Sequence, residues 1–228
     1  MTKEVKVLDQ GYVRLEGFSG SDLMVVNAAR ASFNKNHDEM EPGDDKLIDY
    51  LMRKKHATPF EMIDLTFRVK APKPVICEWM RHRFSSFNEA SSRYVVFEPE
   101  FFIPCPDAIR TQIGKAGNYT FQSITNMDTV ESIQYIMKEC YDFSYQKYQD
   151  LMALGLAKEV ARNVLPFGFY STFYYKANLR SLFNFLSLRN DKRALLEIQE
   201  YAKVIEQFVA EVAPISYESF VRNGRVAI

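Results

Sequence analysis

Residues 81–94 read RHRFSSFNEASSRY, and this stretch is more informative about the protein than any other part of the chain. Four of its side chains are cations or strong hydrogen-bond donors: Arg81, His82, Arg83 and Arg93. Serine and asparagine side chains between them supply neutral hydrogen-bond partners. Because the planar guanidinium group of arginine donates to phosphate oxygens two at a time, the segment predicts a dedicated site for an anion.

The charge balance of the whole chain argues against a general attraction to nucleic acid. Among the 228 residues, Lys+Arg and Asp+Glu both number 29, so no net charge draws a polyanion to the surface. This length suits one well-buried domain, and we predict a single domain over residues 1–228. No apolar run approaches a membrane span and the first residues lack a signal-peptide core, so a cytoplasmic protein without a membrane partner is expected.

The cysteines and histidines give no sign of a disulfide framework or a metal site. Cys77, Cys105 and Cys140 are odd in number and widely spaced, and they form no C-x-x-C pair. We predict that they are reduced and buried, and that the protein binds no metal.

The pattern of apolar residues predicts an α+β domain with strands early and helices late. Strands are predicted at 5–15, with a turn at 9–11, at 65–70, at 94–103 with an interruption at Pro99, and at 167–175. Helices are predicted over 22–32 with Ser21 as its cap, 45–55, 75–80, 128–154 with Asp128 as its cap, 157–164, 180–188 and 191–212. The stretches 34–44 and 104–119 are interpreted as loops or a small excursion.

The order R-H-R-x-x-S-x-N-E-x-S-x-R-Y in residues 81–94 resembles the signature of the flavin-dependent thymidylate synthases, with every fixed position filled. The resemblance extends over most of the chain. Four further segments are similar to family motifs and stand in the expected order: ARASF at 29–33, HATPFE at 56–61, ARNVLP at 161–166 and NLRSLFNFLSLR at 178–189.

This resemblance implies a reaction, a fold and an assembly. The reaction is the reductive methylation of dUMP to dTMP, with methylenetetrahydrofolate as one-carbon donor. FAD carries the hydride, which passes directly to the uracil ring, and NADPH reduces the FAD. The implied fold is a twisted antiparallel sheet flanked by long helices in a single domain. The implied assembly is a homotetramer whose active sites combine residues of neighbouring subunits.

The resemblance also implies roles for individual residues. The expected FAD contacts are Ser32, His56, Thr58, Arg81, His82, Arg83, Glu89, Asn178, Arg180 and Asn184. The expected dUMP contacts are Glu78, Arg81, Glu89, Ala90, Ser91, Ser92, Arg93, Arg162 and Arg189. Ser91 is assigned to binding and not to nucleophilic catalysis, because the sequence places no Ser-His-acid arrangement around it. A phosphate beside His82 would favour the protonated imidazole.

Arg189 is the expected catalytic residue. Hydride addition to C6 of uracil places negative charge on the ring oxygens and N3, and a fixed guanidinium group stabilises that charge without losing its proton. Outside its motif, Arg189 would be interpreted as an exposed cation near a helix C-terminus, where the helix dipole favours it.

Three positions depart from the family pattern. Glu78 stands where many relatives carry glutamine, and a carboxylate there repels a phosphate unless it turns to the ribose or pairs with an arginine. Met62 and Arg193 stand where relatives often have histidine.

Three other classes of protein are alternatives to this family. A module for single-stranded nucleic acid would combine the arginines with Phe84, Phe87 and Tyr94, although the neutral charge argues against it. A flavin-binding relative that only oxidises NADPH would fit the three departures. A thymidylate synthase with a cysteine nucleophile is disfavoured, because none of the cysteines carries the surrounding motif.

Overall fold

The computed structural model describes residues 3–115 and 118–228, and an antiparallel sheet forms the centre of this part of the chain. Within the described residues this sheet has five strands in the order β1-β2-β3-β7-β4. Their bounds are β1 (Glu4–Val7), β2 (Gly11–Ser19), β3 (Asp64–Pro72), β4 (Ser86–Glu89) and β7 (Tyr170–Asn178). Strand β7 pairs with both β3 and β4, so a late segment of the chain lies beside residues of the 81–94 stretch. A separate hairpin joins β5 (Arg110–Lys115) to β6 (Asn118–Ser123).

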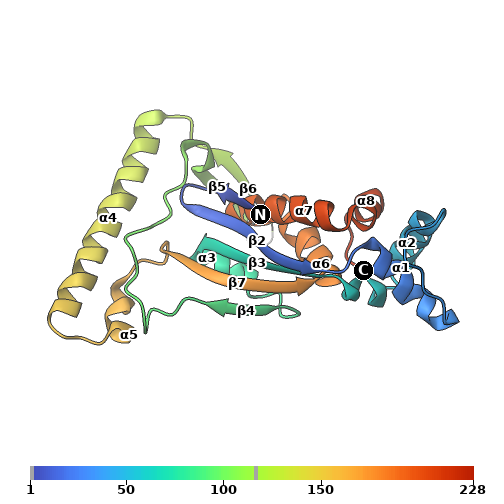
Figure 1. Ribbon diagram of the computed structural model, residues 1–228. Coiled ribbons are helices and arrows are strands. Elements are labelled where there is room, and N and C mark those ends of the chain that lie inside the picture. Colours follow the sequence, from blue (N-terminus) through green and yellow to red (C-terminus); the bar gives the residue numbers. More distant parts are fainter. Residues whose placement is uncertain (1–2, 116–117) are drawn as a thin grey trace.

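Helices lie at both ends of the sheet and along one side of it, as Figure 1 shows. Their bounds are α1 (Asp22–Arg30), α2 (Asp44–Arg53), α3 (Lys73–Trp79), α4 (Met127–Ala153), α5 (Lys158–Ala161), α6 (Leu179–Arg189), α7 (Leu196–Val212) and α8 (Pro214–Arg222). Short 3-10 turns occupy Ala31–Phe33, Thr58–Met62, Pro106–Ala108 and Arg162–Val164. Helix α4 stands across one end of the sheet, and α1 and α2 lie at the other end (Figure 1).

The core lies between the sheet and the helices α3, α6 and α7. Alternate residues of β3, among them Leu65, Phe67 and Val69, are fully buried, as the period of two in a strand requires. The ring of Phe67 stacks on Tyr175 of β7 at 6.1 Å and lies 5.9 Å from Phe208 of α7. These contacts fasten α7 to the middle of the sheet.

Trp79, the last residue of α3, ties this helix to α6. Its ring centroid is 4.8 Å from that of Phe185 in α6 and 5.4 Å from that of Tyr175 in β7. The side chain is fully buried, so its truncation to alanine would lower the free energy of unfolding by about 3 to 5 kcal/mol. The packing brings the residues that follow Trp79 next to Arg189 at the end of α6.

The fold class and most of the predicted elements are confirmed. The predicted strands at 5–15 and 65–70 are β1, β2 and β3, and the predicted long helix at 128–154 is α4. Gly155 ends α4 as expected, with φ +85° and an N–H that donates to the carbonyl of Met152 at 2.9 Å. The predicted helix at 157–164 is α5 followed by a 3-10 turn.

The predicted strand at 94–103 is wrong. The backbone N–H of Tyr94 donates to the carbonyl of Ser91 at 3.0 Å, so the segment begins as a turn. The proline in its middle offers no N–H for a ladder. Among the described residues, Phe101 keeps an isolated bridge with Phe169.

The stretch 104–119, interpreted as a loop or a small excursion, is not a loop throughout, because it contains β5 and the start of β6. Residues 116–117 of that range lie outside the described residues. Every residue of β6 is exposed, so this strand has no buried face whose alternation would mark it in the sequence. Strand β4 was not predicted either, because its four residues are polar or only partly buried.

The last long helix begins five residues later than predicted, at Leu196. Before it, the carboxylate of Asp191 accepts the backbone N–H of Arg193 at 2.9 Å, and the N–H of Ala194 donates to the carbonyl of Asp191 at 2.9 Å. An aspartate that bonds to the backbone two residues on forms a turn in competition with a helix. Helix α8, which follows with proline at its first position, was not predicted.

Smaller corrections concern helix caps and the strand before α6. Ser21 occupies the N-cap of α1 but makes no side-chain hydrogen bond there. The cap of α4 is Asn126, whose side chain accepts the N–H of Thr129 at 2.9 Å, and not Asp128. Strand β7 begins at Tyr170, later than the predicted 167.

The predicted burial of the cysteines is wrong. Cys77, Cys105 and Cys140 carry free thiols, but all three are exposed.

Candidate active site

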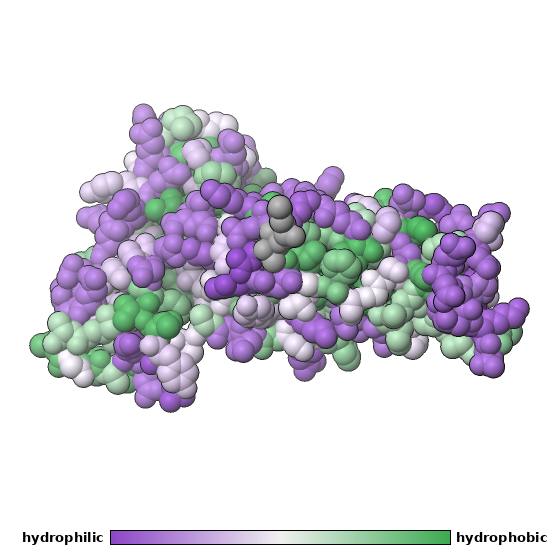
Figure 2. Space-filling model, in the orientation of Figure 1, coloured by the Kyte–Doolittle hydropathy of each residue, from purple (hydrophilic) through white to green (hydrophobic). Residues whose placement is uncertain are grey.

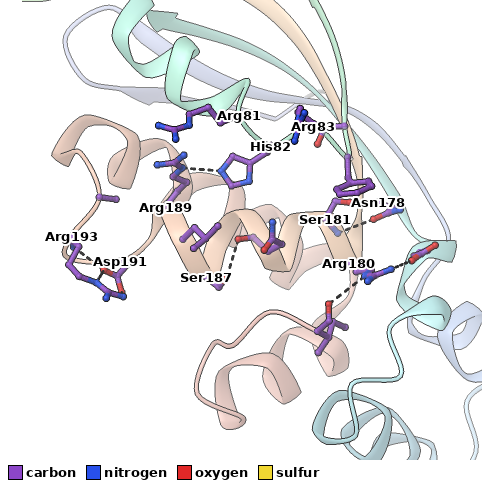
Figure 3. A pocket seen from close by; sticks show the side chains of 17 residues that line it. Arg81, His82, Arg83, Asn178, Arg180, Ser181, Ser187, Arg189, Asp191 and Arg193 are labelled. Carbon is purple, nitrogen blue, oxygen red and sulfur yellow. Dashed lines mark hydrogen bonds and ion pairs between the residues drawn. The ribbon is translucent and has the colours of Figure 1, made fainter. Parts of the chain in front are cut away.

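A cleft of about 1270 Å³ opens beside α6. Five arginines line it: Arg81, Arg83, Arg180, Arg189 and Arg193. Figure 3 shows α6 along the cleft, with Arg180 near its first turn and Arg189 at its last residue, while Arg81, His82 and Arg83 approach from the end of α3. Such a concentration of guanidinium groups in one concave site favours an anionic ligand.

Helix α6 positions one side of the cleft through its cap and its period. The side chain of Asn178 accepts the N–H of Ser181 at 2.9 Å and so caps the helix. Arg180, Asn184 and Leu188 all line the cleft, because residues four apart share a helix face. Residues on the other side of α6, such as Phe185, are buried in the core.

Arg189 is held by groups from the end of α3. Its Nη1 donates to the Glu78 carboxylate at 2.8 Å, and its Nη2 donates to the Glu78 backbone carbonyl at 3.0 Å. Its Nε donates to Nε2 of His82 at 2.9 Å. The side chain of Arg189 is only 16% exposed, so these bonds are weakly screened by solvent.

His82 is neutral in this arrangement. Its Nε2 accepts a hydrogen bond from Arg189, and a protonated imidazole has no lone pair with which to accept. Burial, reinforced by the charges of Arg189 and Arg81, lowers the pKa of His82 from 6.5 to about 4 against the opposing effect of Glu78. The protonated His82 expected beside a phosphate is therefore not the form that this arrangement favours.

A second group of polar residues lies where the 81–94 segment meets α5. Nη1 of Arg162 donates to the buried hydroxyl oxygen of Ser92 at 2.7 Å. Nε of Arg93 donates to the Glu159 carboxylate at 2.8 Å. The hydroxyl of Ser91 accepts the backbone N–H of Arg93 at 3.3 Å. We call these five residues the phosphate cluster; none of them lines the cleft as the described residues define it.

Strand β4 separates the two sites. It runs between Arg83 and the phosphate cluster, and its four extended residues alone hold their ends about 10 Å apart. The dUMP residues expected to act together therefore fall into two groups within one chain. Arg81 and Arg189 line the cleft and Glu78 is bonded to both, whereas the serines and Arg162 are at the far end of β4.

The expected FAD residues are also divided. The cleft brings together six of them: Arg81, His82, Arg83, Asn178, Arg180 and Asn184. Ser32, His56 and Thr58 are exposed on the 3-10 turns and loop near α1 and α2, and they do not belong to the described lining. Glu89 pairs with Lys73 at 2.5 Å. Ala90 follows it, and its N–H donates to the carbonyl of Thr172.

Further residues line the cleft without having been assigned from the sequence: Glu61, Phe84, Ser85, Ser181, Ser187, Leu188, Asp191, Ala194 and Ile228. Glu61 forms an ion pair with Arg180. Because Glu61 lies in the HATPFE segment, the resemblance to the family could have identified it as a site residue. Ser187 and Leu188 follow Arg180 and Asn184 at helical spacing, which was a second signal.

The donor set fits a dinucleotide cofactor such as FAD. Arg81, Arg83 and Arg180 offer charged N–H groups of the kind that bind a pyrophosphate. The volume exceeds the range of about 300 to 1,000 Å³ that is typical of a pocket for one small ligand. Among the described residues, no group of three or more His, Cys, Asp or Glu side chains is arranged to hold a metal ion. In the same part of the chain, none of the helices is long and apolar enough to cross a membrane.

Comparison with known proteins finds a family match over most of the chain. Residues 14–215 match the family described as thymidylate synthase complementing protein. A flavin-dependent thymidylate synthase from Thermotoga neapolitana is 42% identical over 219 residues, which are 96% of this chain and 94% of the relative. A flavin-dependent thymidylate synthase from Thermosipho melanesiensis is 43% identical, with the same coverage.

Solved structures agree with this match. A crystal structure of the UMP/dUMP methylase PolB from Streptomyces cacaoi, bound with 5-Br UMP, has a TM-score of 0.89 and 34% identity, and covers 98% of this chain and 99% of its own. A second structure of the same methylase, bound with 5-Br dUMP, has a TM-score of 0.89 and 36% identity. It covers 98% of this chain and 100% of its own.

Proposed function

Because the chain belongs to the family of flavin-dependent thymidylate synthases, we propose that it methylates dUMP to dTMP with FAD as its bound cofactor. The observation that carries this proposal is the arginine-lined cleft. It joins the RHR segment after α3 to the NLRSLFNFLSLR segment of α6, which are the two longest resemblances to the family. One donor set is thereby built from parts of the chain more than a hundred residues apart.

The finer chemistry follows the family. Methylenetetrahydrofolate provides the one-carbon unit and NADPH is the reductant. When bound, FAD supplies the hydride that the pyrimidine receives at C6. Arg189 faces the negative charge that this addition places on the uracil oxygens and N3. Its largely buried guanidinium group is held by the Glu78 backbone carbonyl and by His82, so its charge is oriented before the reaction begins.

The phosphate cluster is proposed to bind the 5′-phosphate of dUMP. Arg93 and Arg162 supply the charges, and Ser91 and Ser92 supply hydroxyl donors. In the structure Arg93 is paired with Glu159 at 2.8 Å. Both side chains of that pair are about half exposed, so a nucleotide phosphate replaces the carboxylate with little loss. Glu89 and Ala90 connect this cluster to β4.

We propose that the active enzyme is a homotetramer, because the two halves of the nucleotide site lie apart in one chain. A neighbouring copy can bring its phosphate cluster to the cleft of the first. An apolar surface beside that cluster supports such contacts: Leu154 is 84% exposed and Tyr94 is 74% exposed, and Val160 is also exposed. Figure 2 shows apolar side chains gathered over the foot of α4 and α5, and exposed apolar patches of this kind mark association surfaces.

The visible absorption spectrum tests the flavin and nucleotide proposals together. The protein is incubated with FAD, desalted and recorded before and after addition of dUMP, with dTTP and AMP as controls. We expect a retained flavin spectrum that shifts with dUMP and not with the controls. If the protein retains no flavin, the proposed FAD-binding roles of Arg81, Arg83, Asn178 and Arg180 are contradicted. Salt-sensitive binding of the protein to a polyanion column would then favour a module for single-stranded nucleic acid.

A second outcome separates the synthase from a relative that only oxidises NADPH. If flavin is retained and NADPH is consumed, but no dTMP forms in the presence of methylenetetrahydrofolate, the methylation proposal fails. Met62 and Arg193, whose side chains are exposed, would then be the first positions to restore to histidine.

Methylation of UMP is a second candidate activity. It is favoured by the likeness to a protein described as a UMP/dUMP methylase. Glu78 adds a local reason, because a carboxylate near the sugar accepts hydrogen bonds from ribose hydroxyls. The assay compares dUMP and UMP as substrates of the same preparation. Turnover of dUMP without any turnover of UMP excludes this candidate.

A further inference from the structure

Glu78 accepts hydrogen bonds from two of the nitrogen atoms of Arg189. Its carboxylate accepts from Nη1 of Arg189 at 2.8 Å, and its backbone carbonyl accepts from Nη2 at 3.0 Å. The other carboxylate oxygen accepts from Nη1 of Arg81 at 3.4 Å. With His82 on Nε, each of the three guanidinium nitrogen atoms of Arg189 makes one hydrogen bond, so three of its five N–H donors are engaged.

We propose that Glu78 is a resident counter-ion of Arg189, which an anionic nucleotide must displace. The inference rests on the proposed function of the cleft and deepens it. It makes Glu78 a positioning residue that also sets the nucleotide affinity, because the uracil oxygens of the nucleotide must take the place of the Glu78 carboxylate at the same guanidinium group.

The first argument is electrostatic. A carboxylate at 2.8 Å offsets most of the positive charge that Arg189 presents to a ligand. A nucleotide monophosphate is itself an anion, so it is repelled by Glu78 unless that side chain moves. A charge that is already paired also stabilises less of the new charge that develops on a pyrimidine ring. Binding and chemistry therefore both require the pair to loosen.

The second argument is that the Glu78 side chain can leave Arg189 for solvent and for a second arginine. Its side chain is 33% exposed, so the carboxylate can move toward solvent without being buried unpaired. Arg81 is already within 3.4 Å, and the side chain of Arg81 is 72% exposed and free to follow. The carboxylate can pass from Arg189 to Arg81, while the backbone carbonyl of Glu78 and the ring of His82 keep Arg189 in place.

The substitution Glu78→Gln separates charge from geometry. The amide oxygen of glutamine still accepts from Arg189, but the negative charge is gone. If Glu78 only holds Arg189 in position, the affinity for dUMP should not change in this variant. If Glu78 is a resident counter-ion, the affinity for dUMP should rise, because the variant leaves Arg189 with an uncompensated charge for the nucleotide.

The matched control is Asp191→Asn. Asp191 lines the cleft, and its carboxylate is bound by Arg193 at 2.8 Å and not by Arg189. Each variant removes one carboxylate charge that is paired with an arginine of the cleft. A difference between them therefore measures the contact with Arg189, whereas a shared effect measures the general field of the cleft.

The experiment is calorimetric titration of dUMP into FAD-incubated, desalted protein. E78Q should bind dUMP about twofold to fivefold more tightly than the natural chain, which is the range expected for a partly exposed ion pair. D191N should bind within about twofold of the natural chain by the same scale. The affinity of E78Q should also fall more steeply with added salt, because one more unscreened charge attracts the nucleotide.

A second readout does not depend on the nucleotide. The Glu78 charge raises the pKa of His82 against the lowering effects of burial and of Arg189. NMR titration of His82 in the ligand-free protein should therefore give a lower pKa in E78Q than in the natural chain, and an unchanged pKa in D191N. If E78Q folds poorly, E78M removes the same charge at similar volume and replaces it in both measurements.

The outcomes are distinct. Equal or weaker dUMP binding by E78Q, or an equal gain in D191N, overturns the counter-ion proposal while leaving the synthase proposal intact. A natural chain that binds no dUMP and retains no flavin overturns both. Tighter binding in E78Q alone, with the lower pKa of His82, supports the proposal.

Discussion

His82 makes the stability of the protein depend on pH at the level of one side chain. The pKa of His82 is lowered from 6.5 to about 4, so the unfolded chain takes up a proton at a higher pH than the folded chain does. The stability contributed by the neutral imidazole is fully present above pH 6.5 and is lost as the pH falls toward 4.

We expect the free energy of unfolding to fall by about 2 to 3 kcal/mol from this group between pH 7 and pH 4. Denaturant unfolding curves across that interval measure it, with the variant His82→Asn as control. The asparagine side chain can still accept from Arg189 but does not titrate. Curves that lose stability equally in both proteins would contradict the assignment of this pH dependence to His82.

Arg189 is the residue on which the proposed chemistry depends most. Replacement by lysine keeps a positive charge but removes the planar fork that bonds to Glu78 and His82. We expect R189K to lower the rate of dTMP formation by a factor of about 100 or more, which is the usual effect of losing one preorganised donor to a developing charge. Single-turnover assays measure it, and the flavin spectrum checks that the cofactor is still retained. A near-normal rate would mean that Arg189 only anchors the end of α6.

The sequence predicted the residues of the site better than it predicted their grouping. Arg81, His82 and Arg83 could be assigned together because they are adjacent in the chain. The sequence did not predict that Arg93 lies apart from these three residues, because nothing in the motif indicates the extended strand β4 that stands between them. The bond between Glu78 and Arg189 joins positions 111 residues apart, and single-sequence patterns do not report contacts of that range.

At the scale of elements, the N-cap of α6 links stability to cofactor binding. Oδ1 of Asn178 accepts the N–H of Ser181, and Asn178 is also one of the expected FAD contacts that line the cleft. We expect Asn178→Ala to lower the free energy of unfolding by about 1 kcal/mol and to weaken flavin retention.

The variant Asn178→Asp separates the two roles. Aspartate is as good a cap as asparagine, so thermal unfolding should return to the natural curve. It has no amide N–H and it adds a negative charge, so flavin retention should remain weak. Recovery of both properties in N178D would show that the side chain acts as a cap alone.

Elements with one buried face were predictable, and elements without one were not. Strand β3 alternates between buried and partly exposed residues from Asp64 to Ala71, and the sequence shows the same alternation. Strand β6 is exposed throughout, so its sequence carries no such signal. The start of α7 was misjudged because the bonds of Asp191 to its neighbours override a favourable helical composition.

At the scale of the whole molecule, the chain has the shape of a sheet with a helical structure at each end, as Figure 1 shows. The family match over residues 14–215 and the pairing of β7 with β3 and β4 support the proposal of one domain over residues 1–228.

Light scattering on the protein as it elutes from a size-exclusion column tests the proposed tetramer. A monomer at micromolar concentration would contradict it, and Leu154→Glu should shift the natural assembly toward smaller species because it charges the exposed apolar surface.

The separation of the cleft from the phosphate cluster by β4 has a consequence for mixtures of damaged chains. The variant Arg189→Ala damages the cleft but keeps the phosphate cluster intact. The variant Arg93→Ala damages the phosphate cluster but keeps the cleft intact. Each protein alone should be inactive, yet co-refolding the two should restore part of the activity by complementation, because some sites in the mixed assembly receive both intact halves. The same two substitutions placed in one chain, mixed with natural chains, should act as dominant-negative subunits.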